Sequence, residues 1–155
     1  MDGPSTLTRN SLVRTWDTWG PNFKFNFDLK ITGTGAHRSL IHLTTGGNYP
    51  STPGASLPRV LLNTDGGNTF ISVGVHMTGA DGFKAKAYVF EEMNKWYNIE
   101  IEQKDGTFSL TVDGKLFWSA KSGSAVFQNV QWWQSDPWYP SAGEMAEMKN
   151  LKVWF

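Results

Sequence analysis

The clearest hydrophobic pattern in the chain alternates at every second position and runs from Phe23 to Ile31. Five apolar residues in this segment are separated by four polar ones, a period that is typical of a half-buried β-strand. The same alternation recurs at Ile99 and Ile101 and again around Leu110. These segments predict strands with one face in a core and the other face polar.

Turn signals separate the apolar segments. Asp105-Gly106 and Asp113-Gly114 are hairpin turns by composition, and together they predict a three-strand meander from Trp96 to Ser119. Helical spacing is limited to Met145 and Met148, which predicts a single turn at most. The whole chain predicts about eleven strands, roughly at residues 11–19, 23–31, 38–45, 59–63, 69–77, 83–90, 96–103, 107–112, 115–120, 126–134 and 147–155.

So many short strands at regular spacing predict an all-β fold of two antiparallel sheets packed face to face, with a barrel as the alternative. The chain shows no repeat, linker or charge run, so we expect one domain over residues 1–155, with residues 1–8 a loose N-terminal segment. The long segment Gly46–Pro58 predicts an ordered loop over one end of the sandwich. The predicted core is Phe25, Phe27, Leu29, Ile41, Leu43, Val73, Val75, Ile99, Ile101, Phe108, Leu110, Val112, Val130, Leu151 and Val153.

Composition and charge narrow the range of partners. The 14 basic and 14 acidic side chains cancel, so no net field draws the chain to nucleic acid or anionic lipid. With no cysteine, disulfides and thiolate metal sites are excluded. No stretch approaches the roughly 18 apolar residues of a membrane span, and the first residues do not form a signal peptide.

The meander resembles a known group of folds. The segments Asn94–Glu102 and Phe108–Lys115, with the closing Met148–Trp154, are similar to the corresponding strands of laminin G-like modules of the concanavalin A-like lectin/glucanase superfamily. This resemblance implies a jelly-roll sandwich and an extracellular or secreted protein that binds a glycan or another extracellular protein. The galectin His-x-Asn-Pro-Arg motif and the acidic metal segment of legume lectins are both absent.

Eight tryptophans exceed what a sandwich core of this size needs, and six are expected near the surface: Trp16, Trp19, Trp132, Trp133, Trp138 and Trp154. The adjacent Trp132 and Trp133 must point to opposite faces of a strand, so one lies outside the core. Asp136, Trp138 and Tyr139 follow in a proline-flanked loop. Flat rings beside a carboxylate suit a sugar, so these five residues form a candidate ligand site. The alternative is a lid on the sandwich, with Asp136 capping a turn.

A second group of polar residues lies on or beside the strands that flank the long loop and could bind a polar ligand at one edge: His42, Arg59, Asn63, Asp65 and Asn68. Asp65 and Asn68 enclose a two-glycine segment that most simply forms a turn. Lectin-like jelly rolls often carry calcium, and oxygen donors on loops are its usual ligands. Asp65, Asn68 and Asp81 are therefore the candidate calcium ligands, although no Asp-x-Asp-x-Asp spacing supports them.

Enzymatic motifs are weak. Glu100 and Glu102 have the spacing that suggests a glycosidase pair, but the polar face of an ordinary strand explains both. The three histidines show no metal-ligand spacing, and no nucleophile motif is found. We therefore expect a non-catalytic carbohydrate-binding module or lectin. The alternatives are a laminin G-like protein-interaction or adhesion module and a glycoside hydrolase of the glucanase type.

Overall fold

The computed structural model describes residues 11–47, 52–135, 137–140 and 142–155. Within them the chain forms eleven β-strands and one 3-10 turn, η1 (Ala142–Glu144). The strands are β1 (Ser11–Trp19), β2 (Phe23–Ile31), β3 (Arg38–Thr44), β4 (Arg59–Asp65), β5 (Asn68–Val75), β6 (Lys84–Val89), β7 (Trp96–Lys104), β8 (Thr107–Val112), β9 (Lys115–Lys121), β10 (Phe127–Ser135) and β11 (Ala146–Trp154).

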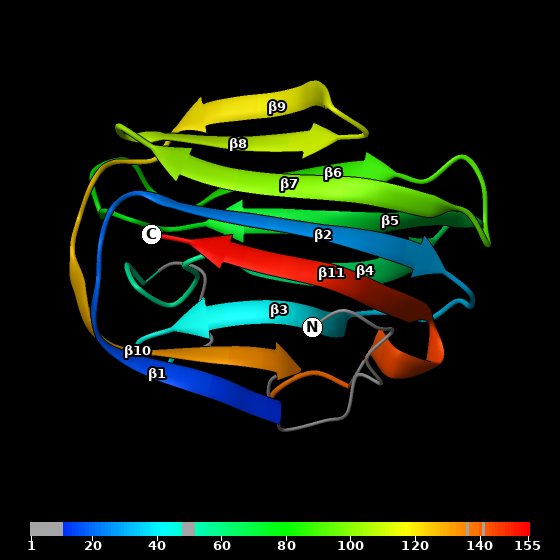
Figure 1. Ribbon diagram of the computed structural model, residues 1–155, viewed down its shortest axis with the longest axis horizontal. Coiled ribbons are helices and arrows are strands. Elements are labelled where there is room, and N and C mark those ends of the chain that lie inside the picture. The colour runs from blue at the N-terminus through cyan, green and yellow to red at the C-terminus, as the bar shows by residue number, and fades with distance from the viewer. Residues whose placement is uncertain (1–10, 48–51, 136, 141) are drawn as a thin grey trace.

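The strands form two antiparallel sheets that pack face to face (Figure 1). The six-stranded sheet has the order β1-β10-β3-β4-β5-β6, and the five-stranded sheet, in front in Figure 1, has the order β11-β2-β7-β8-β9. The predicted all-β sandwich is confirmed, and each predicted strand matches an observed one to within two residues at either end. The expected loose segment 1–8 lies outside the described residues. No helix in the described part of the chain could cross a membrane.

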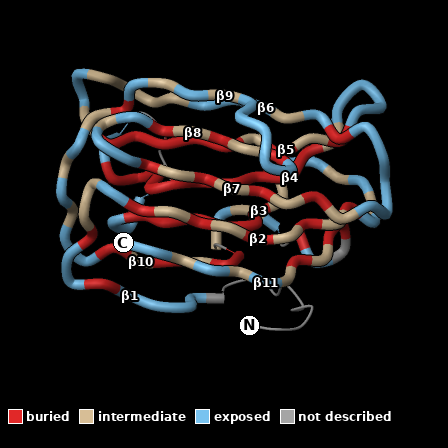
Figure 2. Tube along the Cα trace, turned by 45° about the horizontal axis from the view of Figure 1, so that its top comes forward, coloured by how far each residue is buried: buried red, intermediate tan, exposed pale blue. Residues whose placement is uncertain are grey.

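The core lies between the sheets, and β2 shows how the sequence creates it. Along β2 buried and half-buried residues alternate without exception, and Phe25 and Phe27 are fully buried. Figure 2 shows the buried stretches running through the middle of both sheets, with exposed residues at the turns. Leu151 and Val153 are only half-buried, because they lie on the edge strand β11 beyond a register shift. The rest of the predicted core is buried.

The predicted meander is strands β7, β8 and β9. Asp105 and Gly106 have φ angles of 49° and 76°, and Asp113 and Gly114 have φ angles of 49° and 73°. Two consecutive left-handed residues are the signature of type I′ hairpin turns, whose twist matches that of the flanking strands. The Asp-Gly pairs therefore fix the register of this part of the five-stranded sheet.

Three tryptophans that the sequence placed near the surface are buried instead. Trp16, Trp19 and Trp132 are 8%, 1% and 8% exposed. Trp16 stacks on Trp132 with ring centroids 5.8 Å apart, and Phe155 meets both Trp16 and Trp19 within 5.5 Å. Figure 1 shows the cause, since β10 and β1 extend beyond the edge strand β11 of the other sheet. The inner face of β1 and β10 is therefore covered there by the tryptophan rings themselves and by Phe155.

The long loop joins the end of β3 to the start of β4, and its backbone bonds residues at the ends of β3 and β5. Its described part, residues 52–58, runs between β3 and the chain that follows β5. Leu57 N donates to Leu43 O, and Gly54 N donates to His76 O. The loop therefore extends the six-stranded sheet locally, and residues 48–51 lie outside the described part.

Candidate functional site

The candidate site lies on the outer face of the six-stranded sheet. Val60 and Leu62 of β4 point into the core, so alternation turns Arg59, Leu61 and Asn63 outward. All three are nonetheless less than 10% exposed. Residues facing away from the core are buried only when something covers them, and two loop segments do so here.

The first cover is the segment Pro137–Pro140, which crosses the outer face. The Trp138 ring lies edge-on to His42 with centroids 5.5 Å apart, and the Tyr139 ring stacks on His37 at 6.2 Å with 22° between planes. Trp138 keeps 39% of its surface exposed. The segment therefore folds back on the sheet, as the lid interpretation expected, but over the outer face, where its rings remain open to solvent.

Phe83 provides the second cover and shapes the surroundings of Arg59. The guanidinium Cζ lies 5.7 Å from the Phe83 ring centroid and 5.9 Å from the Tyr139 ring centroid. Gly74, opposite Arg59 in register, makes this possible, because a Cβ there would collide with the Phe83 ring. An arginine held by two aromatic rings is both cationic and immobilised.

A hollow of about 530 Å³ opens beside this arginine. Its wall includes Arg59, Asn63, Ser72, Phe70, Tyr139 and His37. The Asn63 Oδ1 accepts a hydrogen bond of 2.8 Å from His37 N, and His37 has a left-handed φ of 49°. A non-glycine residue in that conformation is strained, and such strain is concentrated at functional sites. The hydrogen bond to Asn63 holds the histidine at the rim.

The remaining predicted ligand residues have different positions. His42 is fully buried, with its Nε2 atom 2.6 Å from Ala55 O, so it supports Trp138 from beneath. Trp133 lies opposite His42 in register and is half-buried on the outer face. Trp132 was predicted to contact the ligand, but this prediction is wrong. Its side chain points into the core, where its ring stacks on Trp16. Asp136 lies outside the described residues.

The proposed calcium trio is wrong as a set. Asp65 and Asn68 close the β4–β5 turn, at the start of β5. Asp81 follows the far end of β5, where its Oδ2 accepts a hydrogen bond from Thr78 Oγ1 at 2.8 Å. Eight strand residues span about 25 Å, so these carboxylates cannot share an ion. No cluster of three metal-binding side chains occurs among the described residues. Asp65 instead contributes to the hollow.

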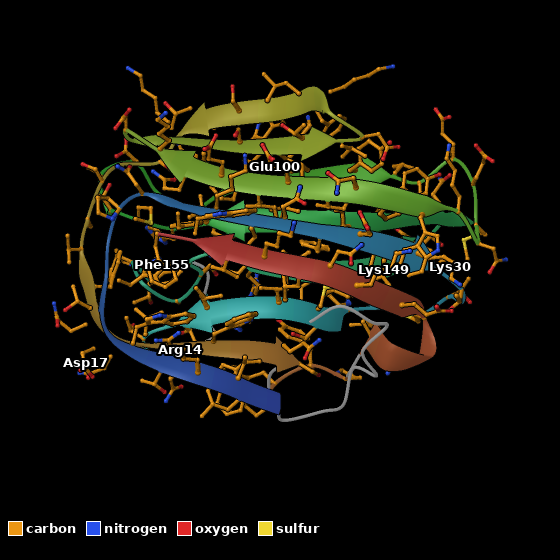
Figure 3. The ribbon with its side chains drawn as sticks, in the orientation of Figure 1. Arg14, Asp17, Lys30, Glu100, Lys149 and Phe155 are labelled. Carbon is orange, nitrogen blue, oxygen red and sulfur yellow. The ribbon has the colours of Figure 1, made fainter. Side chains whose placement is uncertain are left out.

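The two glutamates of β7 lie on the outer face of the other sheet. Glu100 and Glu102 alternate with the buried Ile99 and Ile101, as the strand interpretation predicts. The Glu100 carboxylate forms an ion pair with Lys24 Nζ at 2.7 Å, and Figure 3 shows Glu100 on the front face of this sheet. Both are half-buried on an ordinary polar strand face.

Sequence reasoning missed His37, Phe70, Ser72 and Phe83. Phe70 carried a usable signal, because it is out of phase with the core residues Ile71 and Val73 and must therefore point outward. His37 reaches the hollow through a left-handed backbone conformation, which the neighbouring residues in the sequence do not predict. Phe83 reaches the site only because residue 74 is a glycine.

No protein-family model matches the chain, and no curated protein matches it either. Solved structures do match. The CBM40 of the Ruminococcus gnavus IT-sialidase, determined bound to α2,3-sialyllactose, has a TM-score of 0.60 at 11% identity, covering 98% of this chain and 91% of that one. The heptameric SAP-like pentraxin of Limulus polyphemus has a TM-score of 0.58 at 10% identity, and the match covers 96% of this chain and 74% of the pentraxin chain.

A third match is the PL7 alginate lyase AlyA1 of Zobellia galactanivorans, with a TM-score of 0.54 at 13% identity, covering 88% of this chain and 64% of that one. All three have the concanavalin A-like jelly-roll sandwich, and this chain has the same fold. Identities this low show the fold alone.

Proposed function

We propose that the chain is a non-catalytic carbohydrate-binding domain whose site is the hollow beside Arg59. The observation that carries the proposal is the clamp of Arg59 between Tyr139 and Phe83, at the wall of an open cavity on the sheet's outer face. A buried cation held rigidly next to an accessible aromatic ring is arranged for a ligand with both polar groups and an apolar face.

The lining of the hollow fits the chemistry of a sugar. A pyranose ring presents a flat C–H face and a border of hydroxyl groups. Tyr139 and Phe70 supply aromatic surface, and Asn63, Ser72 and Asp65 supply donors and acceptors. The volume of about 530 Å³ lies within the range of ligand pockets, roughly 300–1,000 Å³. One or two sugar rings match that space.

The comparisons support carbohydrate recognition in general. Carbohydrate-binding modules occur among the structural matches, including CBM66 of Bacillus subtilis, which has a TM-score of 0.50 and covers 100% of this chain and 99% of that one. Because this chain spans nearly all of these modules, we propose that it is a comparable binding unit. An extracellular or secreted location belongs to the same proposal.

A glycan array tests the proposal. We expect the wild-type chain to give discrete hits that free sugar competes away. Tyr139→Ala, which removes a half-buried ring at the wall of the hollow, should weaken those hits by about tenfold or more, since a ring contact contributes about 0.5–1.5 kcal/mol beyond its buried area. Arg59→Lys keeps the charge but loses the planar group held between the rings, and should also weaken binding.

The matched control is Phe117→Ala, an exposed aromatic on β9 of the other sheet, which should leave the hits unchanged. Array binding that survives both Tyr139→Ala and Arg59→Lys would place the site elsewhere. An array without hits, together with capture of one defined extracellular protein that Tyr139→Ala abolishes, would favour the alternative adhesion module, since tyrosine and arginine are also hot-spot residues.

A second candidate, a polysaccharide lyase, is favoured by one observation. His37 and Tyr139 stack in the same hollow as Arg59, which brings two proton-transfer groups beside a cation. In a β-elimination, one group takes the proton next to a carboxylate while a cation stabilises the negative charge that develops, and a second group donates a proton to the glycosidic oxygen as its C–O bond breaks. Unsaturated products released from alginate, and lost in His37→Ala, would replace the binding proposal. Reducing ends released from a β-glucan would instead support the glucanase alternative.

A further inference from the structure

A second aromatic surface lies at one end of the five-stranded sheet. Trp154, the last residue of β11, is 47% exposed, and Phe155 is 67% exposed. Phe155 rests against the rings of Trp16 and Trp19, so one side of its ring is anchored and the other is open. Figure 3 places Phe155 at this end of the sandwich. Anchored rings lose little entropy when a ligand stacks on them.

The two rings border a hollow of about 280 Å³, whose polar wall is formed by Asn22, Lys24, Glu102 and Lys104. Its size is just below that of drug-sized pockets, so it suits a single ring. The strand register assembles it, because Trp154 of β11 is opposite Lys24 of β2, and Lys24 is opposite Glu102 of β7. The hollow thus crosses three adjacent strands.

Three of the four side chains of this polar wall, Asn22, Glu102 and Lys104, are available for a ligand, and the Lys24 ammonium lies 5.9 Å from the Trp154 ring centroid. Lys24 forms its ion pair with Glu100 rather than with Glu102, its neighbour in register. Within the described chain, the side chains of Glu102 and Lys104 have neither a hydrogen bond nor an ion pair. Asn22 accepts a bond from Asp105 N through Oδ1, which leaves its amide N–H groups as donors.

We propose that this surface is a second saccharide site that takes one neutral pyranose ring. The ring would stack on Trp154 or Phe155, while the Glu102 carboxylate accepts from hydroxyls and Lys104 and Asn22 donate to them. Glu102 and Lys104, on the same strand face, cancel in charge, so the site does not select an anion.

The second site and the Arg59 hollow have no lining residue in common. The Arg59 hollow is on the outer face of the six-stranded sheet, and this one is on the outer face of the five-stranded sheet. If both bind, a single domain holds two chains of one polysaccharide, or two parts of one chain, and gains affinity by linkage.

Indole N–H resonances of the ¹⁵N-labelled wild-type chain test this proposal. Trp154→Phe assigns the Trp154 resonance, and Trp138→Phe assigns a reporter for the Arg59 hollow. The probes are cellohexaose, laminarihexaose, xylohexaose, mannohexaose and chitohexaose, with an oligogalacturonide as the charged comparator. We expect at least one neutral probe to shift the Trp154 resonance saturably, and Trp154→Ala to weaken that binding about tenfold.

The two reporters keep this proposal separate from the proposed function. A Trp154 resonance that no neutral probe shifts overturns the second site, whatever the Trp138 resonance does. A Trp154 shift that disappears in Tyr139→Ala also overturns it, because the effect would then originate in the first hollow. A Trp154 resonance shift that persists in Tyr139→Ala supports the second site. If the Trp138 resonance of the wild-type chain does not shift with any probe, the result also counts against the first site.

Discussion

Trp138 lies edge-on to His42, with ring centroids 5.5 Å apart and planes at 61°, and the same imidazole contacts the carbonyl oxygen of Ala55 at 2.6 Å. One buried histidine thus joins the aromatic segment 137–140 to the long loop beside β3. The aromatic segment and the long loop share this support, so the position of the Trp138 ring depends on His42.

Trp138→Ala should lower the free energy of unfolding by about 1 kcal/mol, because the ring is partly exposed and its contact with His42 is lost. Trp138→Phe should restore most of that loss. Urea denaturation followed by far-ultraviolet circular dichroism measures both. A loss of about 3–5 kcal/mol in Trp138→Ala would instead identify the ring as a core element.

Gly74→Ala should displace the Phe83 ring and with it one side of the Arg59 clamp. We expect a destabilisation of about 1–3 kcal/mol, typical of overpacking, together with weaker binding to any glycan found on the array. Gly20→Ala is the matched control, because no atom lies within 4 Å of the added Cβ. Thermal unfolding of the two variants compares them, and equal midpoints would contradict the clamp.

Phe27→Ala should lower the free energy of unfolding by about 3–5 kcal/mol, since the side chain is fully buried in the middle of β2. Phe117→Ala removes an equal ring that is 41% exposed on β9 and should cost about 1 kcal/mol or less. Chemical denaturation of both variants gives the comparison. Similar losses would mean that the core is not where the sheets meet.

Stability should fall in alkaline solution, in part through Tyr88. Burial, with the nearby Tyr97 and Asp113, raises the pKa of Tyr88 above its ordinary value of 10.0. The folded chain therefore holds this proton more tightly than the unfolded chain, so the contribution is complete below about pH 10 and is lost as pH rises through the raised pKa. Urea midpoints measured from pH 8 to 11 should decline less in Tyr88→Phe than in the wild type. Parallel declines would refute this role.

Strands could be predicted from the sequence because local chemistry specifies them. The alternation of Phe23–Ile31 and the left-handed Asp105-Gly106 turn act within a few residues, and both are found as expected. The helical spacing of Met145 and Met148 predicted a single turn at most, and the structure has the 3-10 turn η1 directly before Met145, with Met148 in β11 as the predicted strand requires. Strand order could not be obtained in this way, since pairs such as β1 with β10 depend on long-range packing.

The faces of the tryptophans were harder to predict. Register shifts near Leu12 and Arg14 break the alternation of β1, so sequence spacing no longer tells which side Trp16 occupies. For Trp132 and Trp133, alternation requires opposite faces but does not say which residue points inward. The candidate site shares this difficulty, because it combines Arg59 of β4 with Tyr139 and Phe83 from loops far away in the chain.

The order of the strands has a consequence for how the chain folds during its synthesis. The first strands pair with the last: Thr18 bonds Gln128 across 110 residues, and Asn150 bonds Asp28 across 122. β1 and β2 therefore leave the ribosome long before β10 and β11 exist to complete their sheets. Such non-local pairing predicts slow folding, with unpaired apolar strands exposed to chaperones until the C-terminal strands are released.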